Sequence, residues 1–208
     1  MTPLDATVFV VDDDPLVRDA LKSLIKSVEL NVHTFPSARE FLDHDLPHEP
    51  CCLILDIRLP LLSGLDLQDE LAKRNLTIPV IFITGHGTVP LSVRAMKAGA
   101  MDFIQKPFED QDLLDAIYRG IEQDRQAKLV QAETRKIKRR LKSLTPREYE
   151  VFALVVAGML NKQIAFDLEM SEHTVKTHRA RVMKKMQAES LADLVRLSEK
   201  SDMLTQKG

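Results

Sequence analysis

The sequence has little that would place the chain outside the cell or in a membrane. Its two cysteines, Cys51 and Cys52, are adjacent, and neighbouring residues rarely form a disulfide, so no secreted disulfide framework is expected. No apolar run reaches the roughly 20 residues that span a bilayer. The N-terminal residues lack the basic and apolar regions of a signal peptide. We therefore expect a soluble, cytoplasmic protein with both thiols reduced.

The composition names no partner by itself. The formal net charge is -2 at pH 7, so no bulk excess of charge points to nucleic acid or to a membrane surface. The chain also has no internal repeat and no low-complexity tract. Its length of 208 residues suits one large domain or two smaller ones.

Four short predicted strands, three of them wholly apolar, are informative because each ends in a polar side chain. Residues 8–11 precede Asp12, residues 52–55 precede Asp56, residues 80–83 precede Thr84, and residues 103–105 precede Lys106. Such apolar runs are typical of strands that are buried on both faces of a parallel sheet. Ligands bind outside the carboxyl ends of these strands, so we expect the four polar side chains to meet at one edge of the sheet.

The acidic residues at this edge predict a metal site. Asp12 and Asp13 are adjacent, and a strand-to-helix turn can direct both carboxylates toward Asp56. Three acids repel one another unless a cation lies among them, and a hard divalent ion that keeps several waters, usually Mg²⁺, suits such a site. Asp14 precedes Pro15, which favours the first position of a helix, so we assign Asp14 to helix capping.

The other two strand ends supply a hydroxyl and an ammonium group. Together with a metal ion, Lys106 can neutralise incoming phosphoryl oxygens, and the Thr84 hydroxyl can donate a hydrogen bond to one of them. Pro107 keeps the preceding lysine extended and can adopt the cis form, which would fix the direction of the ammonium. The four strand ends therefore predict a phosphoryl-acceptor site.

Residues 5–122 resemble a two-component receiver domain, because these acids, the Thr and the Lys occur in order at matching spacing. By that resemblance Asp56 is the phosphorylated residue. The resemblance also implies that Asp12 and Asp13 hold Mg²⁺, with the backbone carbonyl of Arg58 as a third protein ligand. We therefore expect a receiver domain over residues 1–122.

The resemblance also assigns the groups around the phosphoryl group and the fold. It implies that Thr84 and Lys106 contact the phosphoryl group and that Phe103 is the aromatic switch residue. The alternation of strands and helices predicts an α/β doubly wound, flavodoxin-like sheet with strand order 2-1-3-4-5. In the first helix, expected over 15–28, we expect Leu16 and Ala20 on the apolar face with the later leucines and valines.

The composition changes after residue 122. Residues 122–142 contain no Gly and no Pro and are rich in strong helix formers, so we expect residues 123–143 to be a helical linker that continues the last receiver helix. The basic run over 135–140 is compatible with a DNA-contacting arm and equally with a solvated basic helix face.

A second domain is expected over residues 144–208. Thr145, Pro146 and Glu148 form a capping-box pattern that begins a helix. A short helix over 161–168, a turn, and a longer basic helix over 172–186 predict a helix-turn-helix, and a fourth helix is expected over 188–199. This makes the second domain a small all-α unit of four helices.

The basic helix has two interpretations. Its exposed face can enter the major groove of DNA, or it can be the solvated face of a small helical bundle. If the helix enters the major groove, we expect seven residues to contact DNA: Lys162, Thr174, Lys176, Thr177, Arg179, Ala180 and Lys184.

The segments 144–148, 161–165 and 171–178 resemble the four-helix output domain of the LuxR class. The whole chain resembles the FixJ/NarL response regulators, and the FixJ branch through residues 83–87 and 100–104. In the NarL branch the base-reading positions fall on Lys176, Thr177 and Ala180. Ala180 departs from the lysine often found there, so the preferred DNA sequence stays open.

The resemblance implies a transcription activator that a sensor histidine kinase switches on by phosphorylating Asp56. Its expected partners are DNA with a two-fold promoter site, RNA polymerase, and a second copy of the chain when phosphorylated. Two alternatives use the same residues. One is a phosphatase-like hydrolase with Asp56 as nucleophile. The other is a DNA binder that is independent of phosphorylation and has a degenerate receiver.

Overall fold

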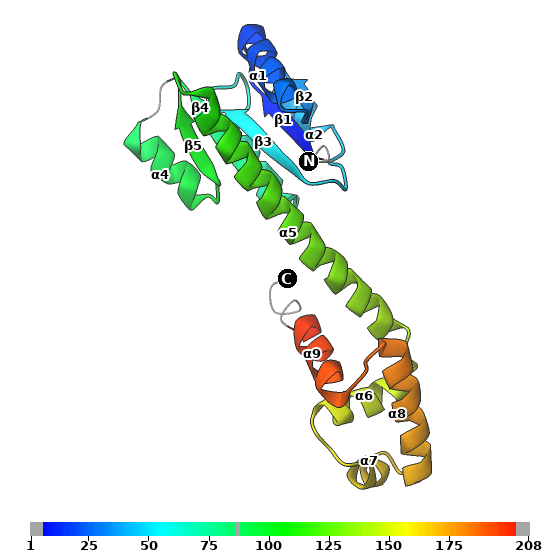
Figure 1. Cartoon of the computed structure of the whole chain (residues 1–208). Helices are drawn as coiled ribbons and strands as arrows, with labels where there is room; N and C mark the ends of the chain where they lie inside the picture. Colours follow the sequence, from blue (N-terminus) through cyan, green and yellow to red (C-terminus); the bar gives the residue numbers. More distant parts are fainter. Residues whose placement is uncertain (1–5, 86–87, 203–208) are drawn as a thin grey trace. The chain divides into compact units, whose positions relative to one another are not determined.

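The computed structural model describes residues 6–85 and 88–202 (Figure 1). The chain folds into two compact units, one ending at Lys128 and the other beginning at Leu129. The first unit has a five-stranded sheet with helices packed on both of its faces, as the sequence predicts. His86, which belongs to one of the motifs above, lies outside the described residues.

The sheet is parallel throughout, in the order β2-β1-β3-β4-β5. The strands are β1 (Thr7–Val11), β2 (Asn31–Phe35), β3 (Cys51–Asp56), β4 (Val80–Thr84) and β5 (Asp102–Gln105). Helices α1 (Pro15–Ser27), α2 (Ala38–Leu42), α3 (Gly64–Lys73), α4 (Val89–Lys97) and α5 (Asp110–Lys142) alternate with them. This confirms the predicted strand order.

Side chains alternate between the two faces along each central strand. On β3, Leu53 and Leu55 pack toward the side of α2, α3 and α4, while Cys52 and Ile54 pack toward the side of α1 and α5. Both faces are buried, which explains why the strands read as continuous apolar runs. Cys51 and Cys52 therefore point to opposite faces, and both are free thiols.

The expectation for the apolar face of α1 is partly wrong. Leu21 and Ile25 are buried, but Leu16 is 77% exposed and Ala20 is also exposed. The stripe that packs on the sheet starts at Val17 and continues with a helical period. Leu16 lies one residue, about 100° of helix rotation, away from that stripe.

Helix α5 is attached to the receiver unit by a polar clamp, which we define as Asp124 and Lys128. The Asp124 carboxylate is 2% exposed and accepts the backbone N–H of Cys51 at 2.8 Å, at the start of β3. The Lys128 ammonium lies 2.8 Å from the same carboxylate oxygen and donates to the carbonyl of Glu49 at 2.6 Å. The charged pair thus satisfies backbone groups that the sheet leaves open.

The second unit contains α6 (Pro146–Val156), α7 (Asn161–Asp167), α8 (Glu172–Met186) and α9 (Leu191–Asp202) around one apolar core. The predicted capping box of α6 is present, with Thr145 and Glu148 exchanging hydrogen bonds. Glu148 is 3% exposed, and its carboxylate also accepts Lys185 Nζ at 2.5 Å.

The expected start of the fourth helix at residue 188 is wrong. Gln187 adopts a left-handed conformation (φ 53°) that ends α8, and α9 begins at Leu191. Ser190 and Asp193 cap the new helix, because Asp193 N–H donates to Ser190 Oγ at 3.1 Å and Glu189 N–H donates to Asp193 Oδ2 at 3.2 Å.

Candidate phosphoryl-acceptor site and DNA-binding helix

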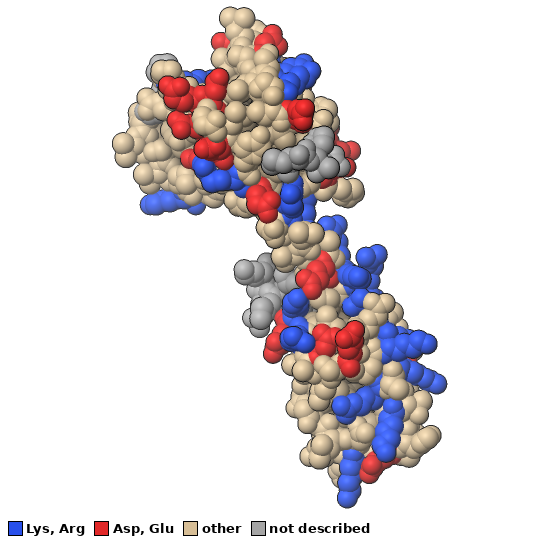
Figure 2. Space-filling view, viewed as in Figure 1, with Lys and Arg blue, Asp and Glu red and all other residues tan. Residues whose placement is uncertain are grey.

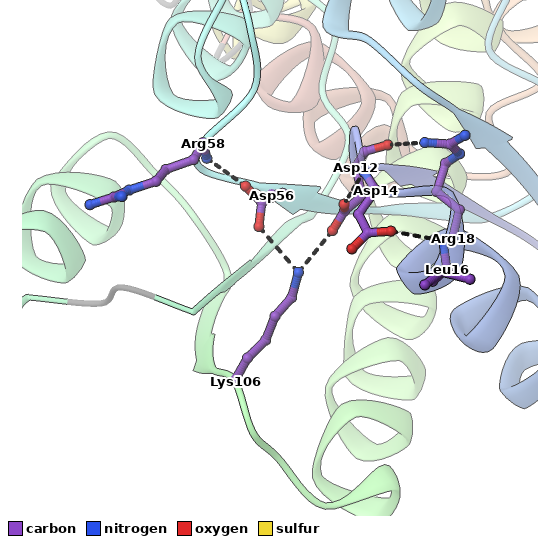
Figure 3. Close-up of polar contacts among 7 residues, drawn as sticks. All are labelled: Asp12, Asp14, Leu16, Arg18, Asp56, Arg58 and Lys106. Atoms are coloured by element: carbon purple, nitrogen blue, oxygen red, sulfur yellow. Dashed lines mark hydrogen bonds and ion pairs between the residues drawn. The ribbon is translucent and has the colours of Figure 1, made fainter.

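Asp56 lies at the carboxyl end of β3, where the central strand leaves the sheet (Figure 3). Its side chain is 9% exposed. One carboxylate oxygen, Oδ2, accepts the backbone N–H of Arg58 at 2.5 Å, and the other, Oδ1, lies 3.3 Å from Lys106 Nζ. The Arg58 side chain is exposed and points away from this carboxylate (Figure 3).

Lys106 bridges the ends of two strands that are not neighbours in sequence. Its ammonium lies 2.8 Å from Asp12 Oδ2 and 3.3 Å from Asp56 Oδ1. The backbone N–H of Lys106 donates to the carbonyl of Thr84 at 2.8 Å, which ties the lysine to the end of β4. The Lys106–Pro107 peptide is cis, the form that the sequence allows.

The three consecutive acids have three different environments. Asp12 is 2% exposed, and its Oδ1 accepts the backbone N–H of Asp14 at 2.9 Å. Asp14 is the N-cap of α1 and accepts Leu16 N–H at 2.8 Å, which confirms its capping role. Asp13 is exposed beside them. Arg18 donates to the carbonyl of Asp12 at 2.7 Å and so holds the turn (Figure 3).

Burial and charge shift the protonation equilibria of this site in opposite ways. Burial raises the pKa of Asp56, and the Lys106 ammonium and the Arg58 N–H offset only part of that rise. For Lys106, burial lowers the pKa, but the hydrogen bond and charge of Asp12, followed by the charge of Asp56, outweigh burial and raise it. The site therefore holds Lys106 charged and leaves the Asp56 carboxylate short of compensating positive charge.

The donor set fits a hard cation. Asp12 and Asp56 supply carboxylate oxygens, which Mg²⁺ prefers, and the raised pKa of Asp56 indicates that further positive charge would stabilise its ionised form. Within residues 6–85 and 88–202, the structure holds no ready-made group of three His, Cys, Asp or Glu side chains around one metal position. Mg²⁺ that keeps several waters needs no such cage.

Thr84 lies at the same edge, and Phe103 lies two residues before the end of its strand, in register with Phe82. Thr84 ends β4 and is 1% exposed. Phe103 is on β5, half-buried, and packs against the core cluster on the α4 side of the sheet. One residue that the sequence reasoning missed is Gly64, at the start of α3. A Cβ there would lie 2.3 Å from the carbonyl oxygen of Asp56, so only glycine fits beside the acceptor.

In the second unit, α8 has the charge of a DNA-binding helix. It contains five Lys or Arg residues and one Glu. Figure 2 shows Lys and Arg side chains gathered over the side of this unit where Figure 1 places α8. Lys176, Thr177, Ala180 and Lys184 are all exposed, as predicted. Lys162, on α7, is exposed as well.

Two other predicted contact residues are engaged within the protein. Arg179 is half-buried, and its guanidinium donates to Asn161 Oδ1 at 3.1 Å, so it connects α8 to α7. Thr174 is half-buried, and its hydroxyl lies 2.8 Å from that of Ser171, the N-cap of α8.

The helical period reveals two exposed residues that the prediction left out. His173 and Arg181 are exposed. Each lies four residues from Thr177, and Arg181 lies three residues from Lys184, so these residues share one face of the helix. The signal was present in the sequence, because Val175, Val182 and Met186 define the buried face and so define its opposite.

Comparison with known proteins agrees with both units. Residues 8–118 match the family described as response regulator receiver domain, and residues 142–198 match the family described as bacterial regulatory proteins, luxR family. The chain belongs to the two-component response regulators of the FixJ/NarL type, with a receiver and a LuxR-type DNA-binding domain. It is a transcription regulator and not an enzyme, so the hydrolase alternative is wrong.

Relatives match over nearly the whole chain. Nodulation protein W of Bradyrhizobium diazoefficiens is 53% identical over 194 residues, which are 93% of this chain and 86% of that protein. Response regulator protein TmoT of Ectopseudomonas mendocina is 46% identical, with 96% of this chain and 91% of that protein covered. Transcriptional regulatory protein FixJ of Rhizobium meliloti is 44% identical, with 93% and 95% covered.

Solved structures include similar chains. The low-resolution structure of response regulator StyR is 46% identical and superposes with a TM-score of 0.87, covering 94% of this chain and 99% of that one. This chain is similar to the StyR regulator over nearly its whole length. Full-length FixJ from B. japonicum is 40% identical with a TM-score of 0.56, covering 95% and 97%. Among the described residues, no helix has the length and apolarity needed to cross a membrane.

Proposed function

We propose that a sensor histidine kinase phosphorylates Asp56 in the cytoplasm and that this event switches transcription. One observation carries the proposal: Asp56 Oδ1 lies 3.3 Å from Lys106 Nζ, at the sheet edge that also holds Asp12 and Thr84. The carboxylate oxygen is the nucleophile, and the lysine ammonium is placed to bind an oxygen of the incoming phosphoryl group.

Mg²⁺ supplies positive charge that neutralises phosphoryl oxygens when it is bound at this site. Asp12, Asp13 and Asp56, with the carbonyl of Arg58, are the groups we propose to hold it. Asp12 already has one positive partner, because its Oδ2 is paired with Lys106 at 2.8 Å. Asp13 is exposed and has room to turn toward the ion.

The labelling experiment compares the parent with Asp56→Asn, which keeps the shape and removes the nucleophile. Acetyl phosphate with Mg²⁺ should label the parent only, and Asp13→Asn should be labelled more slowly at a given Mg²⁺ concentration. Asp69→Asn, on α3, is a matched control for loss of one exposed acid. Equal labelling of Asp56→Asn would exclude Asp56 as the acceptor.

A groove beside Asp56 is the proposed docking site of the kinase. It has a volume of about 550 Å³ and lies between α1 and the segment after β5, with Val17, Leu21, Leu24, Phe108 and Lys106 among its lining residues. Because Lys106 is shared with the acceptor site, a partner seated in this groove has its reactive group close to Asp56. Ala20→Arg should slow phosphotransfer from the kinase and leave labelling by acetyl phosphate unchanged.

The switch is proposed to run from Thr84 to Phe103 and to end in dimerisation. Phe103 is half-buried, so the core does not fully enclose its ring, and a change in its position is the proposed next step. Helix α4 exposes Val89, Val93 and Met96, at 77%, 45% and 47%, and is the apolar face that a second copy can cover. Beryllofluoride should raise the sedimentation coefficient of the parent and not that of Val93→Asp.

The output is proposed to be binding of two helix-turn-helix units to a two-fold promoter site, followed by contact with RNA polymerase. The exposed residues of α8 enter the major groove, and neighbouring cations contact phosphates. Promoter binding by the parent should tighten with beryllofluoride. The phosphorylation-independent alternative predicts a different result. It would be favoured if the untreated parent and Asp56→Asn, with or without beryllofluoride, bound the promoter equally tightly.

A further inference from the structure

Strand β2 and the segment after α2 bring two imidazoles together at the edge of the sheet. His33 is on β2, and His44 follows α2 by two residues. Their ring centroids are 5.6 Å apart, and the ring planes are inclined by 36°. Both residues are exposed, so one side of the pair faces water.

The two imidazoles also pack against the rings of Phe9 and Phe35. Phe9 contacts His33 at 5.9 Å and His44 at 5.6 Å between ring centroids, and Phe35 contacts His44 at 5.3 Å. Phe9 is fully buried and is the register partner of His33 on the neighbouring strand. Because these contacts restrict both imidazoles, little side-chain entropy is left to lose when they bind a common ligand.

We propose that His33 and His44 form a binding site for a borderline transition-metal ion, Zn²⁺, Ni²⁺ or Cu²⁺. Imidazole nitrogen binds these ions at about 2.0–2.1 Å, which places the ring centres about 3 Å from the ion. Two imidazoles on one ion therefore have centroids about 4.5–6.5 Å apart. The observed 5.6 Å lies in this range. Neutral imidazole is a common ligand of these metals.

The site is an open one. Within the described part of the chain, no group of three His, Cys, Asp or Glu side chains surrounds a metal position, so the two histidines are its protein ligands. Water fills the remaining positions, and the affinity is below that of a closed structural zinc centre with four protein ligands. Its nitrogen ligands also separate it from the acceptor site, whose oxygens select Mg²⁺.

Metal binding has a structural consequence. The ion links β2, an edge strand of the sheet, to the segment that follows α2. A metal that binds the folded state and not the unfolded one stabilises the folded state by mass action. The receiver should therefore unfold at a higher temperature in the presence of Zn²⁺, Ni²⁺ or Cu²⁺ at concentrations above Kd.

The experiment uses the full chain without a histidine tag. Titration of Cu²⁺, Ni²⁺ and Zn²⁺ by calorimetry should give a 1:1 site, and the affinity order should place Cu²⁺ first. His33→Gln and His44→Gln should each weaken that site at least tenfold. His48→Gln, which removes an exposed histidine four residues beyond His44, is the matched control and should bind as the parent does.

A second readout keeps the test independent of folding defects. Circular dichroism should show that each Gln variant is folded, and electron paramagnetic resonance of the Cu²⁺ form should report two nitrogen ligands in the parent. A tenfold excess of Mg²⁺ should leave this signal unchanged. Parent-like affinity in the His33→Gln/His44→Gln double variant would overturn the proposal, as would an equal loss in His48→Gln.

Discussion

The Lys106 ammonium lies closer to Asp12, at 2.8 Å, than to Asp56, at 3.3 Å. The lysine is therefore shared unequally, and the acceptor carboxylate receives the weaker contact. Asp12 is also a proposed ligand of Mg²⁺, so a bound cation would share that carboxylate with the ammonium. The contact with Asp12 thus keeps the ammonium beside Asp56, where the proposed phosphoryl transfer would need positive charge.

Replacing Lys106 should destabilise the receiver. Lys106→Met keeps the length of the side chain and leaves Asp12 and Asp56, which are both buried, without their shared cation. Breaking a buried charge cluster in this way costs about 3 kcal/mol. Urea unfolding at pH 7 measures the loss, and Lys73→Met, at an exposed surface pair, is the control. Saturating Mg²⁺ should restore part of the stability of Lys106→Met. An unfolding midpoint equal to that of the parent would contradict this account.

Removing the charge of Asp56 should stabilise the receiver at neutral pH. Burial raises the pKa of Asp56 in the folded state, so the ionised carboxylate costs stability once the pH exceeds that folded pKa, and the cost is absent below the unfolded pKa. The Tm of Asp56→Asn should therefore exceed that of the parent at pH 7, and the difference should vanish near pH 3. Mg²⁺ should reduce the difference at pH 7, because it stabilises the parent by about 2.7 kcal/mol at 100 times Kd. A Tm difference between Asp56→Asn and the parent that grows toward pH 3 would contradict a raised pKa of Asp56 in the folded state.

Variants of α8 should distinguish residues that contact DNA phosphates from residues that position the helix. Lys176→Ala and Lys184→Ala remove exposed cations, and each lost phosphate contact should reduce the slope of log K against log salt by about 0.9. Arg179→Ala removes the hydrogen bond to Asn161, so its effect should be reproduced by Asn161→Ala and should not be additive in the double variant. Filter binding across a salt series checks both. A full phosphate-type slope change in Arg179→Ala alone would assign Arg179 to the DNA.

Glu148 should make the output unit sensitive to acid. Hydrogen bonds from Lys185 and from the backbone of Thr145 lower the pKa of Glu148 to about 2. Its stabilising contribution is present above the unfolded pKa, near 4.5, and is lost as the pH falls through the folded value. Glu148→Gln should therefore destabilise this unit at pH 7, by about 2 kcal/mol for charged hydrogen bonds, and by much less near pH 2. Thermal unfolding of the full chain at both pH values measures this, with exposed Glu150→Gln as control. An equal loss at both pH values would assign the effect to packing.

The sequence predicts correctly that four polar side chains meet at one sheet edge, because parallel strands bring their carboxyl ends together. Asp12, Asp56, Thr84 and Lys106 each stand at the end of a predicted strand, so local patterns place all four at one edge. The sequence cannot rank the contacts within that edge. Whether Lys106 pairs more closely with Asp12 or with Asp56 depends on side-chain geometry between residues far apart in the chain.

The misplaced features have local or long-range causes. The start of α9 depends on the left-handed conformation of Gln187. Glutamine rarely adopts this conformation, so the sequence does not predict it. The engagement of Arg179 with Asn161 depends on how α7 and α8 pack. The polar clamp of Asp124 and Lys128 joins residues more than seventy positions apart and leaves no periodic signal.

The polar clamp sets a rule for building chimeric regulators from this receiver. A junction at residue 122, where the sequence pattern changes, would discard Asp124 and Lys128 and leave the buried backbone N–H of Cys51 without its acceptor. An unpaired buried donor costs about 1–3 kcal/mol. A sensor that fuses this receiver to a foreign output should therefore keep the native chain through Lys128 and take the partner sequence only beyond it.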